Sequence, residues 1–373
     1  MREELTDAGL QVRLQNVTSK PYYNFTAGRN RTRPNVIART GKGNGTKLIL
    51  NGHIDTVSGD TMKHAFDPHV VGGKLYGRGS SDMKGGVASI VAAAEAIVES
   101  DLDLGGELVL SLVVDEETSG TGTLEFLKTE TGDFCIVAEP TNNTLGIAQA
   151  GYLDFNIYSK GEARHGQTTL PELWANAFVQ ASNLCNRILA DRRIVTKKKY
   201  NGLLMKTTFN FSPAPYPTLP SGAWMTMEEF RINCLLGVIA ERSIAKSTRT
   251  EKLAMNRIKR RIAESNREGQ TNRFELLDIK PGFIQAPNAY TKAFERTMQY
   301  VLGHHRHSYV YSFCDSSYFY RAGIPTVLFG PGRMELGHGT KEYINISQVK
   351  DATAVFAYAI ENILGSSSST ASR

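Results

Sequence analysis

Residues 77–86 read Gly-Arg-Gly-Ser-Ser-Asp-Met-Lys-Gly-Gly, a glycine-rich turn that leads into a segment rich in alanine and isoleucine. Because residues 85–98 contain few helix breakers, they predict a buried helix. Asp82 stands at the start of that helix, where a carboxylate is often only an N-cap. The glycines around Asp82 also permit the close backbone approach that a carboxylate shared by two metal ions requires. Taken alone, this stretch favours an N-cap role for Asp82 over a role as a shared metal ligand.

Apolar strands alternate with helices on both sides of this turn. Strands are expected at 47–50, 107–114, 134–138 and 326–329, and further helices at 291–302 and 349–364. Continuous apolar strands separated by helices are typical of a parallel sheet that is covered on both faces. We therefore expect an α/β fold with a mostly parallel sheet flanked by helices, built from residues 1–150 and 285–365.

The middle of the chain, residues 151–284, has a different pattern and predicts an inserted α+β domain. Strands are expected at 152–158 and 274–279, helices at 172–189 and 239–266, and irregular structure in the proline-rich stretch 209–220. The serine-rich tail, 366–373, is expected to be disordered. The first ten residues look like the end of a helix, so an opening segment is expected to be missing.

Composition narrows the functional classes. The chain has 373 residues, 41% of them apolar, and no apolar run long enough to span a membrane. The charged N-terminus shows no signal peptide, which predicts a cytoplasmic protein. The four cysteines lack metal-site or disulfide spacing. The net charge is +6, and positive charge is concentrated at 197–199 and 257–261. The second cluster falls on a helical pattern, where a solvated helix face is favoured over a nucleic-acid interface.

Polar side chains follow three of the expected strands. They are His53 and Asp55, then Glu116 and Glu117, then Glu139. Ligand crevices of open parallel sheets lie beyond the carboxyl ends of the strands, so these side chains are expected to meet. Imidazole nitrogens and carboxylate oxygens are the donors that a pair of zinc ions needs. Each residue alone also has an ordinary explanation as a cap or an exposed acid.

Two further relations follow from position. Strand alternation directs His53 and Asp55 to the same side, where Asp55 could hold the second ring nitrogen of a metal-bound His53. Of the adjacent Glu116 and Glu117, one can bind metal while the other stays free as a general base. His338 lies in a glycine-rich loop, where a single histidine usually faces solvent.

Taken in order, these motifs resemble a known family. They are Gly-His-Ile-Asp-Thr-Val, the stretch 77–86, Asp-Glu-Glu, Glu-Pro-Thr and a late His-Gly-Thr-Lys-Glu-Tyr. The set is similar to the co-catalytic zinc amidohydrolases and metallopeptidases, which include acetylornithine deacetylase, succinyl-diaminopimelate desuccinylase, aminoacylase and carboxypeptidase G. The resemblance runs from about residue 35 to residue 364.

The resemblance implies a role for each site residue. Asp82 would bridge two metal ions, with His53 and Glu139 completing one site and Glu117 and His338 the other. Glu116 would be the general acid and base, and Asp55 would orient His53. A histidine of the inserted domain, here His165 in Gly-Glu-Ala-Arg-His-Gly, would help to stabilise the tetrahedral intermediate.

The resemblance also implies a cofactor and a reaction. Two Zn²⁺ ions, with Co²⁺ or Mn²⁺ as alternatives, would activate a bridging water for attack on an amide carbonyl. The substrate would be an N-acyl amino acid or a short peptide, with no nucleic acid and no membrane involved. The inserted lid domain would form a homodimer contact.

The chain departs from the family pattern where substrates are usually held. No Asn precedes Pro220, Leu235 stands where Arg is common, and Asp315-Ser316-Ser317 replaces a frequent Asp-x-Arg. N-deacylation of an acetylornithine-like substrate is the leading prediction and a dipeptidase or a carboxypeptidase is second, but these departures leave the two activities unseparated by the sequence. A catalytically silent amino-acid or peptide binder is the alternative from another class.

Overall fold

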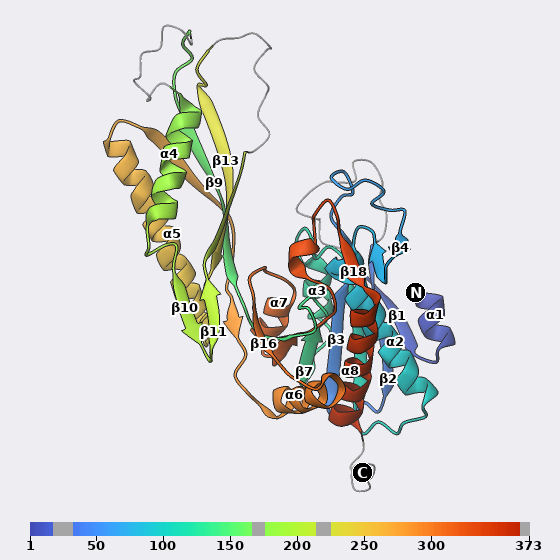
Figure 1. Ribbon diagram of the computed structural model, residues 1–373. Helices are drawn as coiled ribbons and strands as arrows, with labels where there is room; N and C mark the ends of the chain where they lie inside the picture. The colour runs from blue at the N-terminus through green and yellow to red at the C-terminus, as the bar shows by residue number, and fades with distance from the viewer. Residues whose placement is uncertain (18–32, 166–175, 214–224, 366–373) are drawn as a thin grey trace. The chain divides into compact units, whose positions relative to one another are not determined.

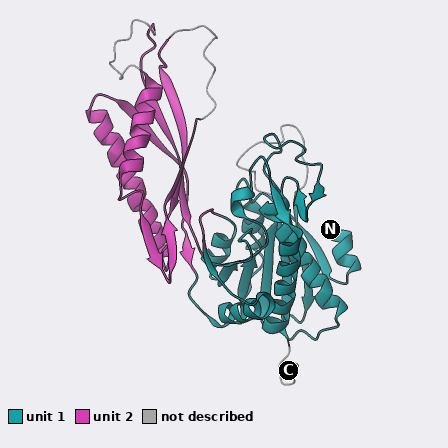
Figure 2. Cartoon of the chain, in the orientation of Figure 1, with its two compact units in different colours: residues 1–147, 285–308, 314–373 teal, residues 148–284, 309–313 magenta. Residues whose placement is uncertain are grey.

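The computed structural model describes residues 1–17, 33–165, 176–213 and 225–365. It divides into two compact units (Figure 2), of which unit 1 contains residues 1–147, 285–308 and 314–373 and unit 2 contains residues 148–284 and 309–313. The tail 366–373 and the loop before Pro220, on which expectations were stated above, lie outside the described residues. Within the described residues, no helix is long and apolar enough to cross a membrane.

Unit 1 is built on a mixed sheet (Figure 1). Its central strands β6 (Glu107–Val113), β3 (Lys47–His53), β7 (Phe134–Val137) and β17 (Thr326–Leu328) are parallel. Strands β1 (Gln11–Asn16), β2 (Pro34–Gly41) and β8 (Leu145–Gln149) run antiparallel to their neighbours. The expected α/β sheet is thus confirmed, with antiparallel strands added outside the parallel centre.

Helices cover both faces of this sheet. Helices α2 (Gly85–Glu99) and α8 (Ile346–Leu364) pack on one face, and α6 (Ala289–Leu302) packs against α8. Helices α3 (Thr121–Phe126) and α7 (Ser316–Arg321) pack on the other face, where Phe126 and Phe319 join Ile49, Val109 and Cys135 in one buried cluster. Burial on both sides explains why these strands are continuously apolar in sequence.

Unit 1 also has smaller elements. Helix α1 (Arg2–Asp7) precedes β1, so the first residues form a short helix. Strands β4 (His69–Val71), β5 (Lys74–Tyr76) and β18 (Tyr343–Asn345) form a second, three-stranded sheet. Strand β18 therefore ties the segment after His338 to the segment before Asp82. Strand β16 (His307–Val310) and strand β15 (Phe283–Ile284), which belongs to unit 2, both pair with β8.

Unit 2 is an antiparallel sheet in the order β12-β13-β9-β14 with two helices. The strands are β12 (Thr208–Pro213), β13 (Glu229–Val238), β9 (Gly151–Lys160) and β14 (Thr271–Lys280), and the helices are α4 (Ala177–Ala190) and α5 (Ile244–Arg267). A hairpin of β10 (Lys197–Tyr200) and β11 (Leu203–Lys206) follows α4. The expectation of irregular structure over 209–220 is wrong for its first part, because pairing with β13 holds that part in β12.

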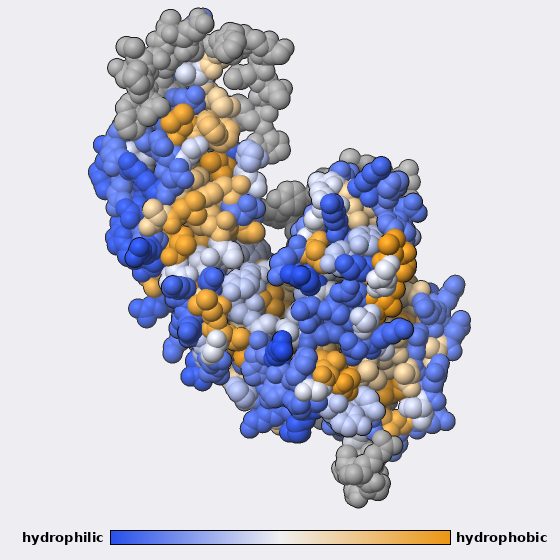
Figure 3. Space-filling model, in the orientation of Figure 1, coloured by the Kyte–Doolittle hydropathy of each residue, from blue (hydrophilic) through white to orange (hydrophobic). Residues whose placement is uncertain are grey.

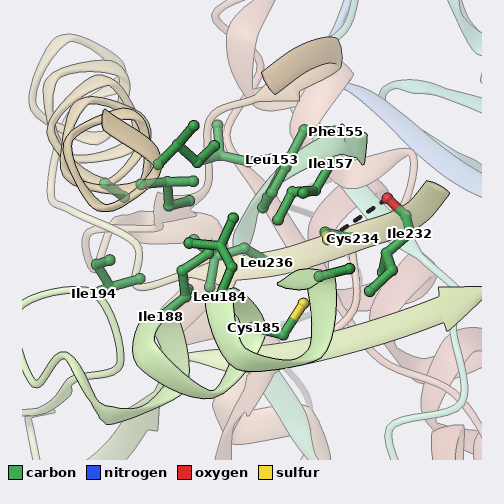
Figure 4. Close-up of a cluster of buried hydrophobic side chains, with 14 of the residues drawn as sticks. Leu153, Phe155, Ile157, Leu184, Cys185, Ile188, Ile194, Ile232, Cys234 and Leu236 are labelled. Atoms are coloured by element: carbon green, nitrogen blue, oxygen red, sulfur yellow. Dashed lines mark hydrogen bonds between the residues drawn. The ribbon is translucent and has the colours of Figure 1, made fainter. Parts of the chain in front are cut away.

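The core of unit 2 follows from strand alternation. Leu153, Phe155 and Ile157 on β9 all face the helices and are fully buried (Figure 4). They pack with residues of α4 and β13, among which Leu184 and Cys234 are also fully buried. Helix α5 also packs on this core, and the side of α5 that faces away from the core is hydrophilic (Figure 3). The exposed residues of α5 include the basic side chains Lys246, Arg249, Lys252, Lys259, Arg260 and Arg267. The helix is thus amphipathic, with its basic residues in solvent.

Gly86 is a position where a side chain would clash with a neighbouring segment of the backbone. A Cβ atom at Gly86 would lie 2.0 Å from the carbonyl oxygen of Ala138, the residue just before Glu139. We expect Gly86→Ala to lower the free energy of unfolding by roughly 1–3 kcal/mol, because the first turn of α2 would have to move away from the end of β7. Urea unfolding would measure this. Gly43→Ala is the matched control, because Gly43 has no neighbour within 4 Å, and an equal loss in both variants would contradict the packing argument.

Asp191, which ends α4, makes unit 2 sensitive to acid. Its carboxylate accepts hydrogen bonds from Arg193 and Arg261, and the hydrogen bond from Arg193 holds its pKa below the ordinary value of 3.8, although burial opposes this. A lowered pKa in the folded state contributes stability that is complete above the ordinary Asp pKa and is lost as the pH falls below it.

We expect Asp191→Asn to lower the free energy of unfolding at neutral pH and to flatten its decline between about pH 5 and pH 2. Urea midpoints across pH test this against Glu228→Gln, which alters an exposed carboxylate; parallel pH profiles for wild type and Asp191→Asn would contradict it.

Candidate metal centre

The acidic and imidazole residues lie at one edge of the parallel strands. His53 is the last residue of β3, Glu116 and Glu117 follow the end of β6, and Glu139 follows β7. Since β6, β3 and β7 are adjacent and parallel, their carboxyl ends meet. Asp82 reaches the same place from the turn η1 (Ser80–Lys84), which begins after Gly79 in the left-handed conformation, with φ of 82°.

Two groups of side chains could each hold a metal ion. In the first, the donor atoms of His53, Asp82 and Glu139 all lie within 4.8 Å of one another, and all three residues are buried. His53 Nε2 is 3.2 Å from Asp82 Oδ1. In the second, the donor atoms of Asp82, Glu117 and His338 lie within the same limit. His338 Nε2 is 2.9 Å from Glu117 Oε2 and 3.4 Å from Asp82 Oδ2.

Asp82 is shared by the two groups. Its Oδ1 faces His53 and its Oδ2 faces His338, so its two oxygens point to two different sites. This arrangement favours a paired centre rather than two independent sites. The bond that follows Asp82, to Met83, is a cis peptide.

The loop that carries His338 is shaped by backbone geometry. His338 itself has φ of 59° and follows the short helical turn Met334–Leu336. A Cβ atom on Gly337 would lie 2.7 Å from Asp82 Oδ2. Only a glycine therefore lets the backbone before His338 approach the shared carboxylate so closely.

Asp55 contacts His53 through its backbone and the adjacent Glu116 and Glu117 through its side chain. The atom within hydrogen-bonding distance of His53 Nδ1 is the carbonyl oxygen of Asp55, at 3.0 Å, while its carboxylate Oδ1 is 3.6 Å away. The carboxylate instead accepts the backbone N–H groups of Glu116 at 3.3 Å and Glu117 at 3.2 Å. Asp55 thus links the end of β3 to the turn after β6.

Asp115 forms the turn that presents Glu116 and Glu117. Its φ is 63°, its carboxylate pairs with Arg33 and accepts the hydroxyl of Thr121 at 2.9 Å, and its carbonyl oxygen accepts backbone N–H groups from the turn that follows. The backbone reverses here, which lets adjacent glutamates reach the same crevice. Glu116 Oε2 lies 3.9 Å from His53 Nε2.

Negative charge is concentrated in this crevice. Burial raises the pKa of Glu116, and the carboxylates of Glu139, Asp315 and Glu117 raise it further. Burial also raises the pKa of Glu139, with Asp82 adding to it. For His53, burial would lower the pKa, but hydrogen bonds to Asp55 and Asp82 raise it overall.

The hydrogen bond to Glu117 raises the pKa of His338. At Asp82, burial raises the pKa, but the hydrogen bond from His53 and the nearby cationic groups outweigh it and leave the pKa lowered. These carboxylates therefore stabilise positive charge on the imidazoles, as they would stabilise cations.

The donor set fits metal ions. Oxygen Oε1 of Glu117 is buried and has no hydrogen-bond partner among the described residues, which is costly unless a cation neutralises it. Two imidazoles and three carboxylates, one of them shared, match the nitrogen and oxygen ligands of zinc, cobalt and manganese.

The structure brings together all the expected site residues of unit 1 and leaves His165 out of both groups. His165 belongs to unit 2, where it is exposed and forms an isolated bridge with Met225. Sequence reasoning missed Arg78 and Glu342, which form a fully buried ion pair beside Asp82, and the buried Asp315, which accepts a hydrogen bond from Thr123 at 2.6 Å. Arg78 and Glu342 stand inside the quoted motifs, but nothing in their spacing showed that they meet.

The mixed α/β fold and the paired donor clusters at the carboxyl edge of its parallel strands define a class, the metal-dependent hydrolases. A family model described as peptidase family M20/M25/M40 matches residues 49–362. The chain belongs to this family, whose members are metallopeptidases and amidohydrolases, and the resemblance stated from the motifs is confirmed.

Individual relatives support the same placement. A peptidase M20 domain-containing protein of Schizosaccharomyces pombe is 34% identical over 168 residues, which cover 44% of this chain and only 38% of that protein. Acetylornithine deacetylase of Klebsiella pneumoniae is 26% identical over 352 residues, covering 88% of this chain and 83% of that enzyme. The crystal structure of a Bacillus subtilis protein described as a dinuclear metal-binding peptidase of the M20 family has a TM-score of 0.62 at 14% identity, covering 97% of this chain and 90% of that one.

Asp55→Asn tests how the crevice is held. An asparagine places an N–H₂ group against one of the two backbone N–H donors of Glu116 and Glu117, so the turn should shift. We expect affinity for Zn²⁺ to fall about 10–100-fold, as is typical when a residue that orients ligands is changed. Competition with a chromophoric chelator measures it, and Asp60→Asn at an exposed position is the control. Equal affinity in the two variants would show that Asp55 is not needed to hold the turn.

Proposed function

We propose that this protein is a two-metal amidohydrolase that removes the acyl group from an N-acyl amino acid. The observation that carries the proposal is the sharing of Asp82 between two groups of metal-binding donors. His53, Asp82 and Glu139 would hold one cation, and Asp82, Glu117 and His338 the other. When bound, such cations supply Lewis acidity and lower the pKa of water, which are the requirements of amide hydrolysis at neutral pH.

Glu116 is proposed as the general base and acid. It is in neither donor group, yet its carboxylate lies within 3.9 Å of His53 at the edge of the first group. A carboxylate that is not needed as a ligand can take the proton of the attacking water and return it to the leaving amine. Asp55 is proposed to keep Glu116 and Glu117 in place through their backbone N–H groups.

His165 is proposed to stabilise the oxyanion of the tetrahedral intermediate. The support is the motif around it, and its exposed position leaves its ring accessible to substrate. Unit 2 is correspondingly proposed to act as a lid and as the contact of a homodimer, in line with the domain limits expected from the sequence. The native cations are proposed to be zinc, with cobalt or manganese as substitutes.

The substrate class rests on the acetylornithine deacetylase of Klebsiella pneumoniae, one of the relatives that align along most of the chain. That relative is named for removing acetyl from an amino acid, acetylornithine. In this chain Leu235 stands where the family commonly has an arginine that helps to hold the substrate carboxylate, so that carboxylate is expected to be held differently.

Glu116→Gln tests the mechanism. Protein loaded with Zn²⁺ or Co²⁺ is assayed against a panel of N-acyl amino acids and dipeptides. We expect wild type to hydrolyse N-acyl amino acids and Glu116→Gln to lose about 10²–10⁴-fold in kcat, because proton transfer by a positioned carboxylate contributes that much. Metal content should be unchanged, since Glu116 is in neither donor group.

The controls separate the alternatives. Glu99→Gln, at an exposed position of α2, should keep full activity, and removal of metal with a chelator should abolish activity until Zn²⁺ or Co²⁺ is restored. Turnover of dipeptides alone would favour a peptidase of the same family. Equally slow hydrolysis of the whole panel by wild type and Glu116→Gln would leave only a silent binding protein.

A further inference from the structure

We propose that Arg78 and Glu342 are positioning residues that hold Asp82 and His338 in one metal cluster. The inference rests on the proposed function and extends it to two side chains that touch neither the donor groups' imidazoles nor the general base. It concerns how the shared carboxylate is fixed in place.

Glu342 holds the backbone of the Asp82 turn. Its Oε1 accepts the N–H groups of Ser81 and Asp82, both at 3.0 Å. Its Oε2 accepts a hydrogen bond from Arg78 Nη1 at 2.7 Å. Since both oxygens are engaged, the carboxylate ties the chain just before Asp82 to the chain just after the His338 loop.

Arg78 is itself held by hydrogen bonds to the segment between β3 and β4. Its Nε donates to the carbonyl oxygen of Ser58 at 3.1 Å, and its Nη2 donates to the hydroxyl of Thr61 at 3.3 Å. The side chains of Arg78 and Glu342 are only 1% and 0% exposed. A buried ion pair is a poor device for stability alone, because well-packed apolar residues usually serve as well. Its contact with the Asp82 backbone indicates a geometric role.

The His338 loop is attached to the Asp82 turn at both ends. At its start, Ser81 Oγ donates to the carbonyl oxygen of Arg333 and accepts the N–H of Arg333, both at 3.0 Å. At its end, Glu342 makes the contacts described above. The His338 side chain is 55% exposed, so little packing holds it, and its place depends on how the loop is anchored.

The two clusters should therefore respond differently when the anchor is changed. In the first cluster only Asp82 depends on the anchor, because His53 and Glu139 are held by β3 and by the end of β7. In the second cluster, both Asp82 and His338 depend on the anchor. A defect at Glu342 should consequently weaken one of two cations more than the other, whereas general destabilisation would weaken both.

Glu342→Gln is the test. A glutamine must direct its N–H₂ group either at the backbone N–H groups of Ser81 and Asp82 or at Arg78, and all of these are donors. The matched control is Glu107→Gln, which alters a glutamate paired with Arg39 at 3.1 Å and Lys47 at 2.8 Å, at the amino end of β6. Both variants remove one carboxylate charge from an ion-pair network of unit 1.

The readout is metal binding rather than turnover. Metal-free protein is titrated with Zn²⁺ against a chromophoric chelator, and with Co²⁺ followed by its visible absorption. We expect two equivalents in wild type and in Glu107→Gln. In Glu342→Gln, one equivalent should weaken about 10–100-fold while the other changes less than about threefold. Wild-type protein that binds no pair of cations would overturn the proposed function and this inference with it.

A second variant separates positioning from folding. Arg78→Met combined with Glu342→Met removes both buried charges, so no unpaired charge is left and much of any lost stability should return. Methionine offers no oxygen to the backbone N–H groups of Ser81 and Asp82, so the selective loss of one equivalent should persist. Two tight equivalents in Glu342→Gln or in the double variant would overturn the inference, as would equal weakening of both equivalents.

Discussion

The main physical constraint on this structure is the electrostatic cost of gathering buried carboxylates at one edge of a sheet. Asp82, Glu117 and Glu139 meet there with only two imidazoles, and one glutamate oxygen has no partner among the described residues. Buried anions are unfavourable unless cations or hydrogen bonds compensate them. Bound cations would supply this compensation, and the surrounding hydrogen bonds hold the carboxylates in place.

Close backbone approach makes this assembly possible. Gly337 lies against the Asp82 carboxylate and Gly86 lies against the carbonyl of Ala138, so two glycines bring segments distant in sequence into contact. Asp115, with its positive φ, turns the chain so that neighbouring glutamates share one crevice. The ligands come from strand ends, while backbone hydrogen bonds to Asp55 and Glu342 fix the loops between them.

Much of this could be predicted from the sequence, and the limits have physical causes. The strands that end at His53 and near Glu117 were predictable because burial on both faces requires continuous apolar runs. The strand over 208–213 was not, because its pairing with β13 is non-local and overrides the local prolines. That His53 Nδ1 lies within hydrogen-bonding distance of the carbonyl oxygen of Asp55, and not of its carboxylate, also could not be predicted from a pattern of residue types.

The sequence by itself determined the α/β class, the candidate donors and the family, because strand periodicity and short motifs are local properties of the chain. Only the tertiary structure decided that Asp82 divides its two oxygens between His53 and His338, and that Arg78 meets Glu342 beneath it. The contacts of Asp82 with His338 and of Arg78 with Glu342 join residues more than 250 positions apart, and their existence depends on how the sheet and its loops pack. Side-chain identity specifies which groups can interact, whereas distance and burial decide which of them do.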